Sequence, residues 1–333
     1  MKRSKIGPIE IIPGEHESHV PYCTSLLVHG KDHDALIDCG GGKTAFDYLQ
    51  KQNIRNLYLT HYHIDHIWGA YLFKDAEIAI NTYDRKKLSD RDELARASGL
   101  YALCGEEGAK KRVKHLLENE QDAEELKPNW NPVLGITDKV YPYEKEIEIA
   151  DTKMRILHTP GHTEGYCCPY FPEYGVFFCG DFDLTSFGPW YNDADSDIEQ
   201  FFKSAERTLE VDAKYYVTAH HKGTFERSEY ENRLRRFMDK IREREEKTRK
   251  AVQRGILPKD IVYEEIFYYR RTHTEKPHLM ESEIIGIAKH LDHLIKQGCP
   301  FEAYFEAFNE HFGLHREWLN FRSKPDRVLN PRT

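Results

Sequence analysis

The sequence has 333 residues, of which 39% are hydrophobic, so it can bury one large core or a large domain with a small appendage. A net charge of −8 and an isoelectric point near 6.1 argue against a nucleic-acid binder, which usually carries a basic face. The seven cysteines are scattered and odd in number, which is typical of reduced thiols in a cytoplasmic protein. We expect no signal peptide and no membrane-spanning segment, because no apolar run is long enough.

Short β-rich runs open the chain and lead to a polar cluster. Residues 22–28 and 35–37 are separated by a polar turn and predict a hairpin. Asp38 follows, ahead of a cysteine and three glycines that form a turn, and residues 43–51 then predict a helix. A buried strand ends at Thr60 and is followed by the sequence His-Tyr-His-Ile-Asp-His.

Three histidines and a carboxylate lie within these six residues: His61, His63, Asp65 and His66. Nitrogen and oxygen donors of this kind suit zinc, iron or manganese. In an extended loop His61 and His63 point to one side, while Asp65 and His66 can turn toward a second point, so two metal ions could share the loop. The alternative is a set of surface histidines in a chain that has 18 of them. The coincidence of four ligand types with a strand end favours the metal site.

This His-x-His-x-Asp-His pattern resembles that of the metallo-β-lactamase-fold hydrolases, in which a distant His, a bridging Asp and a last His follow in fixed order. The resemblance implies an α/β (α+β) fold for residues 1–225, an αββα sandwich of two mixed sheets flanked by helices, with metals at one edge. It also implies that Asp38 supports the metal loop. A turn-capping role for Asp38 fits its local sequence equally well.

Residues 84–130 are charged and helix-prone, and they predict two helices interrupted near Gly105 and Gly108. Compared with the family's smaller members, this stretch is a helical insertion. Long insertions beside an active site often cover it and shape the substrate pocket. A solvated helical decoration is equally consistent with the sequence.

Two further candidate ligands follow predicted strands. After strands over 140–150 and 153–158, Pro160 and Gly161 make a tight turn that directs His162 toward the sheet edge. The resemblance implies that His162 completes the site of the first two histidines, while His158 is the local alternative.

The strand predicted over 176–179 ends in Gly180 and Asp181. By resemblance, Asp181 bridges the two metals. The true β-lactamases of this fold lack this residue, so we do not expect antibiotic hydrolysis. Thioesterase, lactonase, phosphodiesterase and dioxygenase relatives keep it.

An aromatic stretch comes directly after the bridging residue. Phe187, Trp190 and Tyr191 could wall an apolar substrate pocket or pack beneath a loop, and the sequence does not choose between these alternatives. Lactonases of this fold carry a Tyr three residues past the bridging Asp, where this chain has Leu184. That difference argues against a lactonase.

A helix over 196–209 and a last strand over 215–217 precede His220, His221 and Lys222. The family has a last His here, which completes the second metal site. The spacing from the strand end in the family favours His220, so His221 would support the site or contact substrate, and Lys222 is a further candidate for substrate contact.

The composition changes at residue 226, and we expect a helical C-terminal domain over 226–333. Residues 226–255 predict one long charged helix, and 260–269 and 282–297 predict two amphipathic helices. This part loosely resembles the winged-helix-like appendage of some proteins with the same fold. Residues 299–333 add an aromatic segment that we expect to be helical.

The implied ligand set predicts a hydrolase with two divalent metal ions, zinc first, with iron or manganese as alternatives. Asp65 and Asp181 are the implied catalytic carboxylates, and a metal-activated water replaces a Ser or Cys nucleophile.

Three functions remain open. The first is a thioester or ester hydrolase similar to hydroxyacylglutathione hydrolase. The second is an endoribonuclease or phosphodiesterase of the same fold, and the third is a non-hydrolytic iron protein resembling persulfide dioxygenase. We expect a small-molecule substrate and neither a membrane nor a nucleic-acid partner, and a homo-oligomer stays open.

Overall fold

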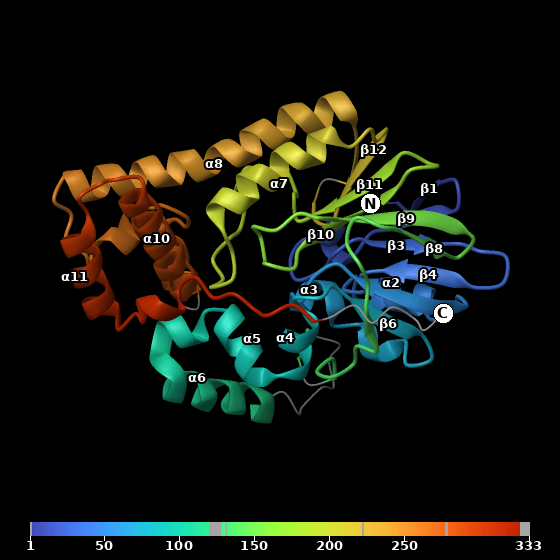
Figure 1. Cartoon of the computed structure of the whole chain (residues 1–333), viewed down its shortest axis with the longest axis horizontal. Coiled ribbons are helices and arrows are strands. Elements are labelled where there is room, and N and C mark those ends of the chain that lie inside the picture. The colour runs from blue at the N-terminus through green and yellow to red at the C-terminus, as the bar shows by residue number, and fades with distance from the viewer. Residues whose placement is uncertain (1, 120–127, 131, 222, 277–278, 327–333) are drawn as a thin grey trace.

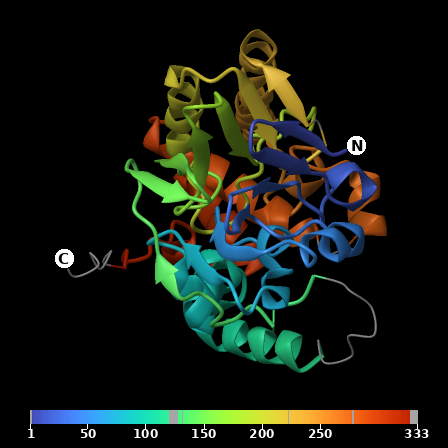
Figure 2. The same cartoon turned by 90° about the vertical axis from the view of Figure 1, so that its right-hand side faces the viewer.

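Two β-sheets pack face to face at one end of the molecule, and helices cover their outer faces (Figures 1 and 2). The computed structural model describes residues 2–119, 128–130, 132–221, 223–276 and 279–326. Its layers are helix, sheet, sheet and helix, as the resemblance implied, and a helical region follows the second sheet.

The first sheet has seven strands in sequence order within the described chain. They are β1 (Ser4–Ile6), β2 (Ile9–Ile12), β3 (Ser25–Val28), β4 (Asp34–Ile37), β5 (Ile54–Leu59), β6 (Glu77–Ile80) and β7 (Lys139–Val140). Strands β4 to β7 run parallel, so their carboxyl ends share one edge. This arrangement brings Asp38, which follows β4, beside the loop that follows β5.

The second sheet contains six strands in the order β13-β12-β11-β10-β9-β8. They are β8 (Glu146–Ile149), β9 (Thr152–His158), β10 (Cys167–Phe171), β11 (Val176–Gly180), β12 (Tyr215–Thr218) and β13 (Thr224–Glu226). Strands β11 and β12 pair in parallel. The residues that follow them, Asp181 and His220, therefore meet at one edge of the sheet.

Apolar residues of both sheets interdigitate in the interior. Leu26 and Ile37 come from the first sheet, and Ile156, Phe178 and Val217 come from the second; all are buried in one cluster. Each outer face has its own cluster. One lies beneath α2 (Lys43–Leu49) and α3 (Ile64–Ile67), and the other lies beneath α7 (Ile198–Glu210) and α8 (Arg227–Gln253). The burial pattern fixes the four layers, because each sheet has two apolar faces to cover.

The segment 84–130 is helical where it is described. It contains α4 (Arg85–Ser89), α5 (Arg91–Ala97) and α6 (Leu100–Asn119). The interruption expected near Gly105 is a kink, because Gly105 has φ 65° and ψ 179° inside α6. These helices lie beside the C-terminal helices at the end of the sheets where α3 begins (Figure 1).

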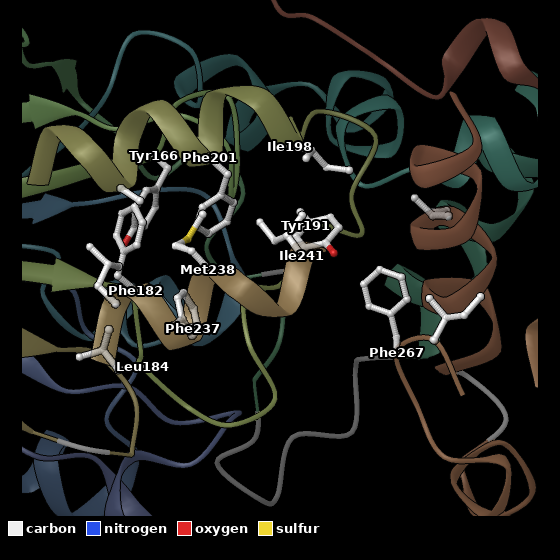
Figure 3. Packing of buried hydrophobic residues seen from close by; sticks show 14 of the residues in the cluster. Tyr166, Phe182, Leu184, Tyr191, Ile198, Phe201, Phe237, Met238, Ile241 and Phe267 are labelled. Carbon is white, nitrogen blue, oxygen red and sulfur yellow. The ribbon is translucent and has the colours of Figure 1, made fainter. Parts of the chain in front are cut away.

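The C-terminal region is helical, with α9 (Arg270–Glu275), α10 (Leu279–Lys296) and α11 (Glu302–Phe312) after the long α8. Among residues 227–276 and 279–326 no strand is present. Its apolar side chains continue the cluster beneath α7, as Figure 3 shows for Ile241 and Phe267. The division of the chain at residue 225 stays a prediction.

The prediction of a helix over 260–269 was wrong. Only a 3-10 turn, Ile261–Tyr263, forms there, because the backbone N–H groups of Phe267 and Tyr268 donate to the carboxylate of Glu283 instead of continuing a helix. The single strand expected over 140–150 is two strands in different sheets, since Glu144 turns the chain with φ 62° between them.

The remaining short elements connect the layers. They are α1 (Glu15–Ser18) and the 3-10 turns Ala70–Leu72 and Arg316–Trp318. All seven cysteines are free thiols. Within the described ranges, none of the helices combines the length and the apolarity needed to cross a bilayer.

Candidate metal centre

The loop after β5 is held from behind by Asp38. Asp38 Oδ1 accepts a hydrogen bond from the Thr60 amide at 2.8 Å, and Oδ2 accepts from the Thr60 hydroxyl at 2.8 Å and from His66 Nδ1 at 2.8 Å. Gly40 is required beside this loop, because a Cβ there would lie 1.5 Å from the Asp65 carbonyl oxygen. Asp38 thus contacts the loop through three hydrogen bonds.

Two groups of ligand atoms converge at this edge. In the first, single donor atoms of His61, His63, His162 and Asp181 all lie within 4.8 Å of one another. In the second, donor atoms of Asp65, His66 and His220 do the same. The seven residues come from separate parts of the chain and meet where β5, β11 and β12 end.

Asp181 connects the two groups through its two carboxylate oxygens. Oδ2 lies 2.9 Å from His162 Nε2 and 3.8 Å from His61 Nε2, in the first group. Oδ1 lies 2.9 Å from His66 Nε2 and 3.7 Å from His220 Nε2, in the second. One carboxylate therefore faces both groups, which is the geometry that a bridging ligand needs.

Each of the five histidines has one ring nitrogen in hydrogen-bond contact with a group outside the cluster. Its other ring nitrogen is directed at the cluster of ligand atoms. The bound nitrogens and their partners are His61 Nδ1 with Thr60 Oγ1, His63 Nε2 with Asp193, His66 Nδ1 with Asp38, His162 Nδ1 with the Trp190 carbonyl, and His220 Nδ1 with the Ser18 and Tyr22 carbonyls. Such outer partners fix the tautomer and the direction of metal-binding histidines.

The inner nitrogens have the surroundings of metal ligands. His61 Nε2 is fully buried without a hydrogen-bond partner, and burying such an atom is costly. The Nε2 atoms of His66 and His220 face each other at 3.3 Å. A cation among them would satisfy them, so the residues present fit a metal pair.

Burial and neighbouring charges shift the pKa values of three residues in the cluster. Burial, with the nearby His66 and His63, lowers the pKa of His61 well below its ordinary value. Burial alone would raise the pKa of Asp181, but His66 and His162 outweigh it and hold that pKa well below its usual range. Burial opposes a charged His66, yet Asp181 and Asp38 keep its pKa well above normal. Asp181 is consequently an anion surrounded by imidazoles.

Gly180 and Tyr166 place Asp181. The Asp181 amide donates to the Tyr166 hydroxyl oxygen at 2.5 Å, and that hydroxyl donates to the Cys179 carbonyl at 2.7 Å. Gly180 has φ 52°, and a Cβ on it would lie 2.3 Å from the Tyr166 oxygen. Glycine is therefore required before Asp181, because a side chain at this position would clash with Tyr166.

The two groups open into a cavity of about 770 Å³. Its apolar walls include Val20, Pro21, Trp130, Phe187, Trp190, Tyr268 and Leu279. Asp65 and Asp181 both line its floor. The loop after β11, the 84–130 segment and the C-terminal region all contribute walls, so a molecule bound beside the two groups of ligand atoms would contact three parts of the chain.

The family model for the metallo-beta-lactamase superfamily matches residues 20–93 and 96–220 of this chain. The chain belongs to the metallo-beta-lactamase superfamily. Its fold is similar to that of a metallo-beta-lactamase family protein from Thermus thermophilus, with a TM-score of 0.60, 17% identity, and coverage of 87% of this chain and 93% of that one. A beta-lactamase domain protein from Burkholderia ambifaria gives a TM-score of 0.59 at 14% identity, covering 89% and 88%. A search of curated protein sequences finds no match.

The aromatic residues that follow Asp181 differ in their positions relative to the cavity. Phe187 and Trp190 line the cavity, and the Trp190 ring lies 5.5 Å from that of His63. Tyr191 takes the other of the two alternatives left open by the sequence: it is fully buried in the core, and its hydroxyl lies 2.9 Å from His290 Nε2 (Figure 3).

His158, the local alternative to His162, stacks against both Tyr83 and Tyr143 and stays out of both ligand groups. His221 lines the cavity next to His220, with its ring 3.9 Å from that of His19. The expectation for Lys222 lies outside the described residues.

Several residues at this superfamily site escaped the sequence analysis. Asp193 binds His63 Nε2 at 2.7 Å and the Tyr62 hydroxyl at 2.8 Å. Asp183 lines the cavity, and burial raises its pKa to about 6. For Asp193 the close succession of acids after the aromatic stretch was the available signal, but its partners are distant in sequence.

Behind these residues lies a buried ion-pair network. Lys87, on α4, donates to Asp84 at 2.8 Å and to Asp195 at 2.6 Å, and all three side chains are inaccessible to solvent. Asp195 Oδ1 also lies 3.3 Å from the Tyr62 hydroxyl. The 84–130 segment is thereby tied to the residue that precedes His63.

Proposed function

We propose that this chain is a dinuclear metal-dependent hydrolase of small-molecule thioesters or activated esters with an apolar acyl group. The observation that carries the proposal is the position of the Asp181-centred ligand cluster at the floor of the apolar cavity of about 770 Å³. This volume falls in the range of small-molecule sites, which are commonly apolar with a few convergent polar groups.

His61, His63 and His162 would hold one ion, and Asp65, His66 and His220 the other, with Asp181 shared. Imidazole and carboxylate ligands suit zinc first, and iron or manganese as alternatives. Divalent ions bound here would polarise a carbonyl oxygen and lower the pKa of a bound water toward neutrality. The chain's own contribution is to fix the direction of each ligand.

The cavity walls select the substrate. Trp190 stands beside the ligand cluster and Phe187 lines the same cavity, so both offer apolar surface to an acyl group. The net charge of −8 on the chain slows the approach of a polyanion such as RNA rather than steering it. A thiol has a pKa of about 8.5, so a thiolate leaves without a dedicated proton donor. These features favour a thioester over an amide or a polynucleotide.

The test compares hydrolysis of a panel of acyl thioesters, esters and lactones with cleavage of structured RNA, using one metal-loaded preparation at low salt. We expect thioester hydrolysis whose kcat/KM falls at least about a hundredfold in His63→Ala and in Asp181→Ala, because each change removes a ligand. His311→Ala, at an exposed histidine on α11, is the matched control and should keep full activity. RNA cleavage without thioesterase activity would reject the proposal in favour of a nuclease.

A further inference from the structure

A second cavity, of about 270 Å³, adjoins the metal pocket. Four residues line both cavities: Ser98, Trp130, Trp190 and Asp193. Of these, Trp190 and Asp193 also contact His63 on the metal loop. The wall between the two cavities is therefore built from residues directly beside the ligand cluster.

The walls of this side cavity are mainly aliphatic. They include Leu94, Ala95, Leu100, Leu103, Val113, Leu134 and Ile285, which come from α5, α6 and α10 and from the segment before β7. Protein interiors are otherwise close-packed, and empty apolar space forfeits dispersion contacts. Water is a poor occupant of aliphatic walls, because it needs two to four polar partners. An apolar ligand fits such a space better.

Most polar groups at this cavity are engaged within the protein, although Arg91 also lines it and the Asn192 Oδ1 atom is buried without a hydrogen-bond partner. The Asn192 amide nitrogen donates to the carbonyl and the hydroxyl of Ser282, at 2.9 and 3.0 Å. Glu281 accepts a two-pronged ion pair from Arg112, at 2.8 and 2.9 Å. Asp193 is held by His63 and Tyr62. These contacts hold the walls in place and leave aliphatic surface for the ligand.

We propose that the side cavity binds the far end of an unbranched acyl chain whose carbonyl group lies at the metal cluster. The inference rests on the proposed thioester or ester hydrolysis and specifies its substrate as a medium- to long-chain acyl derivative. A flexible chain can pass the shared wall at Trp190 and fill the space between α5, α6 and α10. A short acyl group would leave that space empty.

The first test measures chain-length selectivity in the full-length, metal-loaded protein. The ratio of kcat/KM for a decanoyl thioester to that for a butyryl thioester reports on burial of the extra methylenes, each of which contributes up to about fourfold. Leu103→Trp and Val113→Trp fill the side cavity and should lower this ratio by at least about tenfold. Leu257→Trp makes a matched change at a residue that is 55% exposed, and should leave the ratio unchanged.

The second test measures binding of decanoate by calorimetry, which needs no turnover. Wild type and Leu257→Trp should bind decanoate, and the two filling variants should bind it at least about tenfold more weakly. If decanoate binding follows this pattern while no thioester is hydrolysed, the side cavity stands and the proposed reaction fails. Thioester hydrolysis with the same chain-length ratio in wild type and in both filling variants would overturn the side cavity alone.

A change in the opposite direction covers the case in which the filling variants do not fold. Leu103→Ala enlarges the cavity, so its preferred acyl chain should become longer than that of the wild type. An unchanged optimum in Leu103→Ala would contradict the inference. Thermal melting and circular dichroism identify which variants are folded.

Discussion

His63 Nε2 lies 2.7 Å from Asp193 Oδ2, and this contact directs the other ring nitrogen of His63 toward the metal cluster. Nδ1 faces His162 Nε2 at 2.9 Å, inside the first ligand group. Asp193 is 130 residues away from His63 in the sequence and reaches it from the loop between β11 and α7. The direction of a proposed ligand is thus set by a carboxylate that is not itself a member of either group.

Asp193→Asn tests this positioning role. The substitution keeps the shape of the side chain but removes the charge that orients His63, so metal affinity should fall by about 10–100-fold. Competition titration with a chelating dye measures the affinity. Asp239→Asn, which changes an exposed aspartate on α8, should leave metal affinity unchanged. Equal affinity in wild type and Asp193→Asn would show that the contact has no positioning role.

Lys87→Met tests the buried network behind the metal loop. Burial opposes a charged Lys87, but Asp195 and Asp84 outweigh it and raise its pKa above the ordinary value. Removing the cation leaves two buried carboxylates without compensation, so unfolding free energy should fall by about 3–5 kcal/mol. Urea denaturation measures this change. Lys110→Met removes an exposed cation paired with Glu106 and should change stability little. Comparable denaturation midpoints for the two variants would contradict the expectation.

His220→Ala and His221→Ala separate two adjacent histidines. His220 Nε2 lies 3.5 Å from Asp65 Oδ2 and 3.3 Å from His66 Nε2, whereas His221 contributes to the cavity wall. We expect His220→Ala to lose one metal equivalent and nearly all turnover, and His221→Ala to keep both metals. Metal content after dialysis decides between them, and the reverse result would place the ligand one residue later.

Glu283 makes stability depend on pH. Burial raises its pKa to about 7, against the opposing effects of the Phe267 and Tyr268 amides and of Arg244 and Lys247. Between pH 4.5 and 7 the Glu283 carboxyl is therefore protonated more in the folded state than in the unfolded state. Its contribution to the free energy of unfolding is present at pH 4.5 and is lost as the pH rises to 7.

Glu283→Gln removes that titration. The loss of unfolding free energy between pH 5 and pH 7 should be smaller in the variant than in wild type by about 2 kcal/mol. Urea denaturation at the two pH values measures both slopes. Identical slopes in the two proteins would show that Glu283 is ionised across this range.

Much of the site could be predicted because its ligands follow strand ends. His61, His66 and Asp181 each follow a recognisable apolar run, and carboxyl ends of parallel strands meet at one edge. Asp193 and Lys87 escaped notice because their partners are 130 and 108 residues away, and no local pattern encodes such contacts.

Tertiary hydrogen bonds also decide features that the local sequence cannot. The helix expected over 260–269 has suitable periodicity, but the Glu283 carboxylate accepts hydrogen bonds from two of its backbone amides, and this outweighs the local preference. For Tyr191 the sequence left a pocket wall and burial open, and the contact between its hydroxyl and His290 Nε2 accompanies burial.

Metal stoichiometry tests the dinuclear centre most directly. Elemental analysis of the protein, as purified and after reconstitution with zinc, iron or manganese, should find close to two equivalents per chain, because Asp181 faces two separate groups of ligand atoms. Less than half an equivalent of metal per chain after reconstitution with each of the three metals would contradict the dinuclear centre.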